Sequence, residues 1–554
     1  MVRRRSASLM DIAPNANQPP PFEGTDLLAC DLALQAAVER HVPEVMPALR
    51  RWSATLSVPD TYALADAANR NPPTLRTHDR RGERIDEVVF HPAWHALMQL
   101  ATSAGEHCAP WQAPGPGAQV ARTAMYYLHA QVENGTQCPL TMTFASAPVL
   151  ARHAQTVPDA ARWLSCVLTS DYDPRARPVA QKRAALIGMG MTERQGGSDV
   201  RANTTRAELD TTGGAYRITG HKWFFSAPQC DAHLVLAQGA EGLGCFLLPR
   251  FEPDGRRNAI RINRLKDKLG NRSNASAEVE FERALAWPLG APGRGIATIL
   301  EMVQWTRLDC VIGSAGIIRA ATAFALHHAR HRTTFGRVLG EHPLMASVLA
   351  DLALESEAAL ALALHVARAG EAEAESTLGA AMRMVTPAAK YWVCKRAVAA
   401  TAEAMEALGG NGYVEEQPLP RLYREAPVNA IWEGSGNIVC LDVLRAMRRE
   451  PDAADALRQW LATARGANAH YDRHVDSLDA TLAARDADEA DARGVAQAIA
   501  LAVAAAELLR HAPSSVSDAY CASRLAPATF AGAAFGTVRD AGAAAKILSR
   551  ALPE

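Results

Sequence analysis

The turn Met191-Thr-Glu-Arg-Gln-Gly-Gly-Ser-Asp199 lies where the sequence changes from a helical to a β pattern. Over residues 25–183 apolar residues recur every three or four positions, which is typical of amphipathic helices. Over 184–290 short alternating apolar segments, separated by Gly, Asn and Asp, predict one β domain. Long helical patterns return over 291–447 and predict a bundle, and the alanine-rich segment 448–554 predicts an extra helical domain. The sequence therefore indicates an α+β protein whose sheet is segregated between helical domains.

Composition excludes several classes of protein. The chain has 554 residues with 58 basic and 59 acidic side chains, so no global field draws it to nucleic acid or membrane. Ten scattered cysteines without a C-x-x-C motif fit a cytoplasmic protein better than a disulfide framework or a zinc site. Residues 1–24 lack the apolar stretch of a secretory signal and are expected to form a disordered lead-in. The longest apolar run, 494–509, is too short to predict a membrane span.

Common nucleotide and metal motifs are missing. Helices and strands do not alternate, which disfavours a doubly wound fold and an alternating α/β barrel. Gly188-Met-Gly190 lacks the third glycine of a dinucleotide fingerprint, and no Walker A sequence is present. His327, His328 and His331 have no H-E-x-x-H context, so we interpret them as surface or interface histidines and predict no metal site.

Three segments carry residues suited to cofactor chemistry. The turn at 191–199 is followed by Gly220-His-Lys-Trp-Phe-Phe-Ser226, so glycine backbone, hydroxyls and aromatic rings occur together. Gly409-Gly-Asn-Gly-Tyr413 is the second segment, and a helix C-cap is its simpler interpretation. Ile431-Trp-Glu-Gly-Ser-Gly-Asn437 is the third, and its lone carboxylate, Glu433, becomes a general base if burial raises its pKa.

In collinear order, and together with His331-Arg-Thr-Thr-Phe-Gly336, these segments resemble the acyl-CoA dehydrogenase family of flavoproteins. The resemblance covers about 180–447. It is strongest to the AidB-type branch, which is associated with the response to DNA alkylation. That branch shares the Glu-basic-Gln-Gly-Gly-Ser-Asp turn, the Lys-Trp-Phe-Phe-Ser variant, the Ile-Trp-Glu-Gly-Ser-Gly-Asn variant and an extra carboxy-terminal domain.

The resemblance implies an FAD-dependent oxidoreductase that acts on CH–CH bonds, with flavin shared between the subunits of a tetramer built from dimers. Phe224 stands where typical members place a tryptophan, and Ser226 stands where they place a threonine near the reactive flavin nitrogen. Ser435 and Asn437 replace the usual Thr and Gln. The residues implied to hold FAD are Met189, Met191, Thr192, Ser198, Phe224, Ser226, Arg332, Phe335, Gly409, Gly410, Gly412, Ser435 and Asn437.

The same resemblance implies that Glu433 removes the α-proton of an acyl-CoA thioester while a β-hydride passes to flavin. Its backbone N–H and a flavin hydroxyl would stabilise the enolate oxygen. The alternative base position on the first bundle helix, 304–307, has no carboxylate. Glu406 replaces a glutamine near the flavin phosphates, and Arg194-Gln195 alter the turn beside the acyl-CoA path, so turnover is expected to be weak.

The AidB-type likeness also suggests duplex DNA binding without sequence specificity. Residues 451–554 contain ten basic and 13 acidic side chains, which does not favour phosphate binding there. Arg445, Arg448 and Arg449 share one helix face and are the candidate DNA contacts. Two hypotheses stay open: a DNA-associated AidB-like flavoprotein, and a working acyl-CoA dehydrogenase whose helical extension serves assembly.

Overall fold

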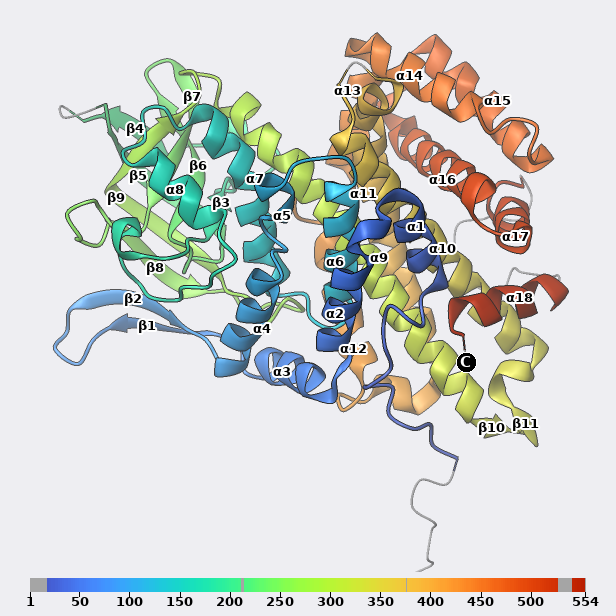
Figure 1. Ribbon diagram of the computed structural model, residues 1–554. Coiled ribbons are helices and arrows are strands. Elements are labelled where there is room, and N and C mark those ends of the chain that lie inside the picture. The colour runs from blue at the N-terminus through green and yellow to red at the C-terminus, as the bar shows by residue number, and fades with distance from the viewer. Residues whose placement is uncertain (1–16, 211–213, 375, 527–540, 554) are drawn as a thin grey trace, which may run out of the picture.

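The computed structural model describes residues 17–210, 214–374, 376–526 and 541–553. The β domain occupies one side of the molecule, the long helices of the bundle run through the middle, and the carboxy-terminal helices pack on the side away from the sheet (Figure 1). The predicted α+β architecture, with an extra helical domain, is confirmed.

The amino-terminal segment packs more closely than its sequence suggests. Phe22 is buried, and its ring lies 4.8 Å from that of Phe324. His327 Nε2 forms a 2.8 Å hydrogen bond with the Pro20 carbonyl oxygen. The prediction of a disordered lead-in is therefore wrong for residues 17–24, because one aromatic side chain anchors the segment to the bundle. Residues 1–16 lie outside the described part of the chain.

The first domain is mainly helical, as predicted, but it also holds a β-hairpin. Strands β1 and β2 pair antiparallel, and Asp79 Oδ1 accepts hydrogen bonds from the Arg81 and Glu83 amides in the turn between them. The helical periodicity of the surrounding sequence hid these short strands. The elements are α1 (Leu32–His41), η1 (Pro43–Val45), α2 (Met46–Ser57), α3 (Pro59–Arg70), β1 (Thr74–His78), β2 (Arg84–Val89), α4 (Pro92–Ser103), α5 (Ala109–Gln112), α6 (Ala118–Ala130), α7 (Gln137–His153), α8 (Ala160–Val167) and η2 (Val179–Gln181).

The β domain is a closed sheet. Strand β7 pairs antiparallel with both β6 and β9, and β5 joins β9 to β4, which also pairs with β6. Closure of this ring gives a barrel, with β8 on the outer side of β9 and β3 beside β6. The elements are β3 (Ile187–Gly190), η3 (Val200–Ala202), β4 (Arg206–Leu209), β5 (Tyr216–Ser226), β6 (Ala232–Gly239), β7 (Gly242–Pro249), β8 (Ile260–Leu265) and β9 (Ser276–Leu289).

The bundle is built on three long helices whose limits agree closely with the apolar periodicity. Helix α9 is joined to α6 by the buried ion pair of Arg122 and Asp309, with 2.6 Å between the atoms. Helices α9 and α16 are long and apolar enough to cross a membrane, but 94% and 72% of their most apolar windows are buried, as in core helices. The elements are α9 (Gly295–His331), β10 (Thr333–Thr334), β11 (Arg337–Val338), η4 (Leu339–Glu341), α10 (Pro343–Glu371), α11 (Thr377–Ala407), η5 (Gly409–Tyr413), α12 (Pro418–Asn429) and α13 (Gly436–Arg449).

The extra domain docks directly on this bundle. Helix α16 packs against α10, α11 and α13, and α18 packs against α10 (Figure 1). Two buried polar pairs cross the contact: Arg524 to Asp351 at 2.8 Å, and His365 to Glu507 at 2.8 Å. The elements are α14 (Pro451–Ala462), α15 (Ala469–Ala484), η6 (Glu489–Asp491), α16 (Ala492–His511), α17 (Ser514–Arg524) and α18 (Ala541–Ala551).

Candidate active site

A buried ion pair fixes the glycine-bearing turn against the barrel. Lys222 Nζ on β5 lies 2.8 Å from Glu193 Oε1, and neither side chain is exposed. The Glu193 carboxylate also accepts hydrogen bonds from the Thr204 and Thr205 amides, at 2.7 and 3.2 Å. Burial alone raises the pKa of Glu193, but Lys222 and these hydrogen bonds outweigh burial and hold it at about 2. The turn is therefore a preorganised element rather than a loose loop.

The turn and the end of β5 present the predicted flavin-facing residues together. The Trp223 amide donates to the Thr192 carbonyl oxygen at 2.8 Å, which holds the turn beside Phe224. Phe224 is half exposed, whereas its neighbour Phe225 is buried in the barrel. Lys266 Nζ lies 4.4 Å from the Phe224 ring centroid. The exposed aromatic face therefore stands next to a turn rich in hydroxyls and glycine, and Met189, which is buried, supports it from β3.

Glu433 lies across this space, in the loop between α12 and α13. It has a left-handed backbone, φ 58°, followed by Gly434 at φ 101°. Lys390 Nζ donates to the Trp432 carbonyl oxygen at 2.7 Å and also to the Gly434 carbonyl oxygen. Arg307 Nε donates to the Glu433 carbonyl oxygen at 3.1 Å. Two buried cations thus hold an unfavourable backbone conformation that projects the carboxylate.

The Glu433 carboxylate is partly buried and has one close side-chain partner. Thr306 Oγ1 donates to Glu433 Oε2 at 2.6 Å. Burial raises the pKa of Glu433, and the Thr306 hydrogen bond, with the charges of Lys390 and Arg307, opposes that rise. A carboxylate with a raised pKa is a better proton acceptor near neutral pH.

Cys138, on α7, connects the two halves of this site. The pKa of its thiol is raised to about 12, because burial and the Glu433 charge outweigh the opposing effects of Lys268 and of hydrogen bonds with Asn274 and Ser226. Ser226 and Glu433 therefore border a common region, as the sequence predicts. Sequence reasoning missed Thr306, Lys390 and Cys138. Of these three residues, only Lys390 could have been identified from the sequence, because it interrupts an apolar helical stretch.

Arg332 and Phe335, two more of the predicted flavin residues, lie at the opposite end of the bundle. Arg332 follows the last residue of α9, whereas Thr306 is near its start, and 26 helical residues span about 39 Å. Arg332 Nη1 donates to the Asn17 carbonyl oxygen at 3.0 Å, and Phe335 is 99% exposed with φ 51°. Within one subunit, this end of the bundle is therefore far from Glu433.

The three glycines of η5 differ in what they do. A Cβ added at Gly409 or Gly410 would meet nothing within 4 Å, so their open backbone is free to approach a ligand. At Gly412 a Cβ would lie 2.1 Å from the Met405 carbonyl oxygen, so packing of the preceding helix end requires this glycine. Asn411 Nδ2 donates to Gln18 Oε1 at 2.9 Å, which brings η5 to the same amino-terminal segment that contacts Arg332.

The other predicted cofactor residues and the candidate DNA contacts are exposed or make local contacts. Ser198 is exposed in the turn, and Ser435 is the residue before the first turn of α13. Asn437 Oδ1 accepts a 2.9 Å hydrogen bond from Arg493 Nε of the extra domain. Arg448 donates to the Ala487 carbonyl oxygen. Arg445 lies 3.5 Å from Asp442 with 59% of its side chain exposed, and Arg449 is exposed beside it.

Comparison with known proteins agrees with this architecture. Three family models match: the adaptive response protein AidB N-terminal domain over 17–174, the acyl-CoA dehydrogenase middle domain over 188–284, and the acyl-CoA dehydrogenase C-terminal domain over 293–448. The putative acyl-CoA dehydrogenase AidB of Escherichia coli is 48% identical over 508 residues, which are 91% of this chain and 93% of that protein.

Two solved structures superpose closely. The apo form of Bd2924 has a TM-score of 0.81 at 30% identity and covers 89% of this chain and 99% of that one. The structure of Caenorhabditis elegans ACDH-11 in complex with C11-CoA has a TM-score of 0.81 at 24% identity, covering 100% and 95% of the two chains, and supports the fold alone.

The site and fold thus define a flavin-dependent oxidoreductase that acts on CH–CH bonds. The chain belongs to the acyl-CoA dehydrogenase family and is similar to its AidB members. The residues present fit FAD: Gly409 and Gly410 leave open backbone, and Phe224 offers an exposed ring. Trp432 Nε1 is a buried donor without a partner among the described residues.

Proposed function

We propose that Glu433 is the base in the α,β-dehydrogenation of an acyl-CoA thioester. The observation that carries the proposal is its partly buried carboxylate, whose pKa is raised by burial and whose one close side-chain partner is Thr306. Bound FAD supplies the hydride acceptor for the β-carbon. Glu433 takes the α-proton onto a carboxylate oxygen, and Thr306 fixes the orientation of that carboxylate.

The backbone around Glu433 supplies a second catalytic contribution. No described residue accepts a hydrogen bond from the Glu433 N–H, while Lys390 occupies the carbonyl groups on either side. This N–H is therefore available to the thioester oxygen, where it stabilises the negative charge that develops as the α-proton leaves. Turnover is proposed to be weak, since Arg194, which lies 5.2 Å from the Trp223 ring centroid, alters the turn expected to border the acyl-CoA path.

The test is anaerobic titration of the FAD-bound protein with saturated acyl-CoAs of increasing chain length. We expect at least one of them to bleach the flavin absorbance of the wild type but not of Glu433→Gln, with FAD retained in both. The proposal fails if no acyl-CoA bleaches the FAD-loaded wild type, or if Glu433→Gln bleaches at the wild-type rate.

The protein is proposed to act as a homotetramer, a dimer of dimers. The support is the distance between the end of the bundle near Glu433 and the opposite end, where Arg332 and Gly410 lie. One flavin contacts residues at both ends only across a subunit boundary. Light scattering during size exclusion should give four chains for the FAD-bound protein. A monomer that retains tightly bound FAD would contradict the shared site.

A second proposed function is non-specific binding of duplex DNA, in a protein that protects or repairs DNA after alkylation. Exposed Arg445 and Arg449 and the neighbouring Arg448 on α13 support it. Their acidic neighbour Asp442 is already bonded to Arg307 at 2.6 Å and Arg383 at 2.8 Å. The arginines therefore retain most of their charge for phosphates.

Fluorescence anisotropy across a salt series tests the DNA proposal. Affinity should fall steeply with salt, and Arg445→Glu combined with Arg448→Glu should weaken binding and reduce the salt slope by about two. Arg473→Glu, on exposed α15, is the matched control and should bind like the wild type. If the protein does not bind duplex DNA at low salt, the DNA proposal fails. The remaining hypothesis is that the helical extension serves assembly.

A further inference from the structure

A cavity of about 260 Å³ lies between the β1–β2 hairpin and one end of the barrel. The hairpin contributes Arg84 and Asp86, while the loop between β7 and β8 contributes Arg250 and Arg257. Arg84 Nη2 donates to the Ile262 carbonyl oxygen at 3.0 Å, which fixes the hairpin over the barrel. The volume is slightly below the range of drug-sized pockets, so it suits a small metabolite.

Two of the arginines that line this cavity have no carboxylate partner. Among the described residues, no Asp or Glu lies within 4 Å of the Arg250 or Arg257 guanidinium. The Arg250 Nη1 atom donates to the Gln229 carbonyl oxygen at 3.1 Å, and Arg257 lies against Phe251, 5.2 Å from the ring centroid. Both therefore bring to the cavity wall a positive charge that no carboxylate contacts directly, although Glu87 attracts both from farther away.

The nearby carboxylates are already neutralised by other cations. Asp86 Oδ2 is 2.9 Å from Arg84, and Asp231 is 2.5 Å from Lys182. Glu87 is bonded to Arg76, and Glu282, which also lines the cavity, lies 2.7 Å from Arg261. Each acid in this group thus has its own base. The surplus of two positive charges is local to Arg250 and Arg257.

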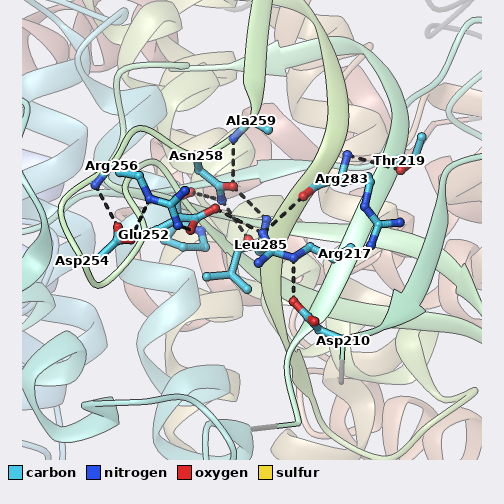
Figure 2. A network of polar contacts seen from close by, with 11 residues as sticks. Asp210, Arg217, Thr219, Glu252, Asp254, Arg256, Asn258, Ala259, Arg283 and Leu285 are labelled. Carbon is cyan, nitrogen blue, oxygen red and sulfur yellow. Dashed lines mark hydrogen bonds and ion pairs between the residues drawn. The ribbon is translucent and has the colours of Figure 1, made fainter. Parts of the chain in front are cut away.

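The loop that carries the two arginines is rigid, and its own acids face elsewhere. Figure 2 shows Glu252 and Asp254 bonded to Arg256, and Glu252 also bonded to Arg217. Asn258 donates to the Leu285 carbonyl oxygen at 2.8 Å and accepts from the Leu285 and Ala259 amides (Figure 2). These contacts hold Arg257 on the cavity side of the loop, without help from a carboxylate.

Partial burial makes the Arg250 charge costly without a ligand, whereas Arg257 is exposed at the cavity mouth. Burial lowers the pKa of Arg250, and the adjacent Arg257 lowers it further. Burial also lowers the pKa of Arg257. An arginine stays protonated at neutral pH, so it cannot avoid the desolvation cost by losing its proton. The positive charge therefore stays in an unfavourable environment. A bound anion relieves this cost.

One acceptor in the same cavity has no donor. Asp86 has a left-handed backbone, φ 39°, and its Oδ1 is buried without a partner among the described residues.

We propose that this cavity binds a small dianion, a phosphate group or a dicarboxylate, between Arg250 and Arg257. The site is separate from the candidate flavin surface. Phe225, which lines the cavity, is 1% exposed, whereas its neighbour Phe224 faces the flavin side. The hairpin that closes the cavity lies within the segment matched by the AidB N-terminal domain.

The test is isothermal titration of the FAD-bound protein with sodium phosphate, glycerol 3-phosphate and succinate at constant ionic strength. FAD occupies the flavin site, so binding reports on another location. We expect saturable binding of at least one dianion, weakened at least tenfold by Arg257→Gln. Arg256→Gln is the matched control, because Arg256 is adjacent in the loop but bonded to Asp254 and outside the cavity, and it should bind like the wild type. Preference among the three probes separates a phosphate site from a dicarboxylate site.

A thermal melt distinguishes loss of the site from loss of the fold. Without added anion, Arg257→Gln should melt close to the wild-type temperature, because the Arg257 side chain is exposed and forms no ion pair with a described residue. The proposal is overturned if none of the three dianions binds the wild type, if Arg257→Gln and Arg256→Gln bind equally, or if ligand-free Arg257→Gln melts well below the wild type.

Discussion

Lys222→Met is the sharpest test of how the cofactor turn is held. The substitution removes the only cation that contacts the buried Glu193 carboxylate among the described residues, at 2.8 Å. Methionine fills similar space, so packing around β5 changes little. The carboxylate then keeps only its hydrogen bonds from Thr204 and Thr205.

The size of the effect follows from the burial of the pair and from the pKa of Glu193. The fold lowers this pKa from 4.5 to about 2, but burial also lowers the pKa of Lys222, which offsets part of this stabilisation of the pair. Removing one partner leaves a buried charge unpaired, and that typically costs about 3–5 kcal/mol. Because the folded pKa is depressed, this stability is present above about pH 4.5 and is lost as the pH falls toward 2. In Lys222→Met the pKa of Glu193 rises, so that loss moves to higher pH.

Urea denaturation at pH 7 should therefore give a free energy of unfolding lower by about 3–5 kcal/mol for Lys222→Met. FAD occupancy should fall with it, because the turn loses its anchor. Arg194→Met, at the exposed neighbouring position, is the control and should change stability by less than about 0.5 kcal/mol. A loss below about 1 kcal/mol in Lys222→Met would refute the role given to this pair.

Three further predictions follow from single contacts. Thr306→Val removes a hydrogen bond that lowers the pKa of Glu433, so the acid limb of the flavin-reduction rate should move to higher pH; an unmoved pH profile would count against Glu433 as the base. Arg524→Met removes the buried ion pair with Asp351 beneath the extra domain, so urea denaturation should show a loss of about 3–5 kcal/mol that exposed Arg473→Met does not share, and equal stability of the two variants would contradict the docking described. A Cβ added at Gly410 meets no neighbouring atom within 4 Å, so Gly410→Ala should change the free energy of unfolding by less than about 0.5 kcal/mol while lowering the FAD bound per chain, and full occupancy would remove Gly410 from the cofactor site.

Much of the bundle follows from the sequence because its helices are long and strongly periodic. The apolar patterns over 296–330, 342–369 and 378–408 agree with α9, α10 and α11 within a few residues. The collinear glycine motifs likewise predict the family, since each depends on local backbone demands that few residue types satisfy.

Contacts between distant segments could not be predicted in this way. The β1–β2 hairpin consists of short strands in a helical context, and its role in closing a cavity depends on Arg84 reaching β8 across the fold. Packing of residues 17–24 rests on one phenylalanine. Thr306 carries no acidic group and no motif, so its hydrogen bond to Glu433 becomes visible only when α9 and the 431–437 loop are placed together.

The most direct test of the central claim is α-proton exchange in D₂O. The FAD-bound protein is incubated with butyryl-CoA or octanoyl-CoA, and proton NMR follows deuterium incorporation at the α-carbon. This readout reports proton abstraction without requiring net oxidation. Wild type should exchange the α-proton, and Glu433→Gln should be slower by a factor of about 10²–10⁴ with FAD still bound. Exchange at the wild-type rate in Glu433→Gln would show that another group removes the proton.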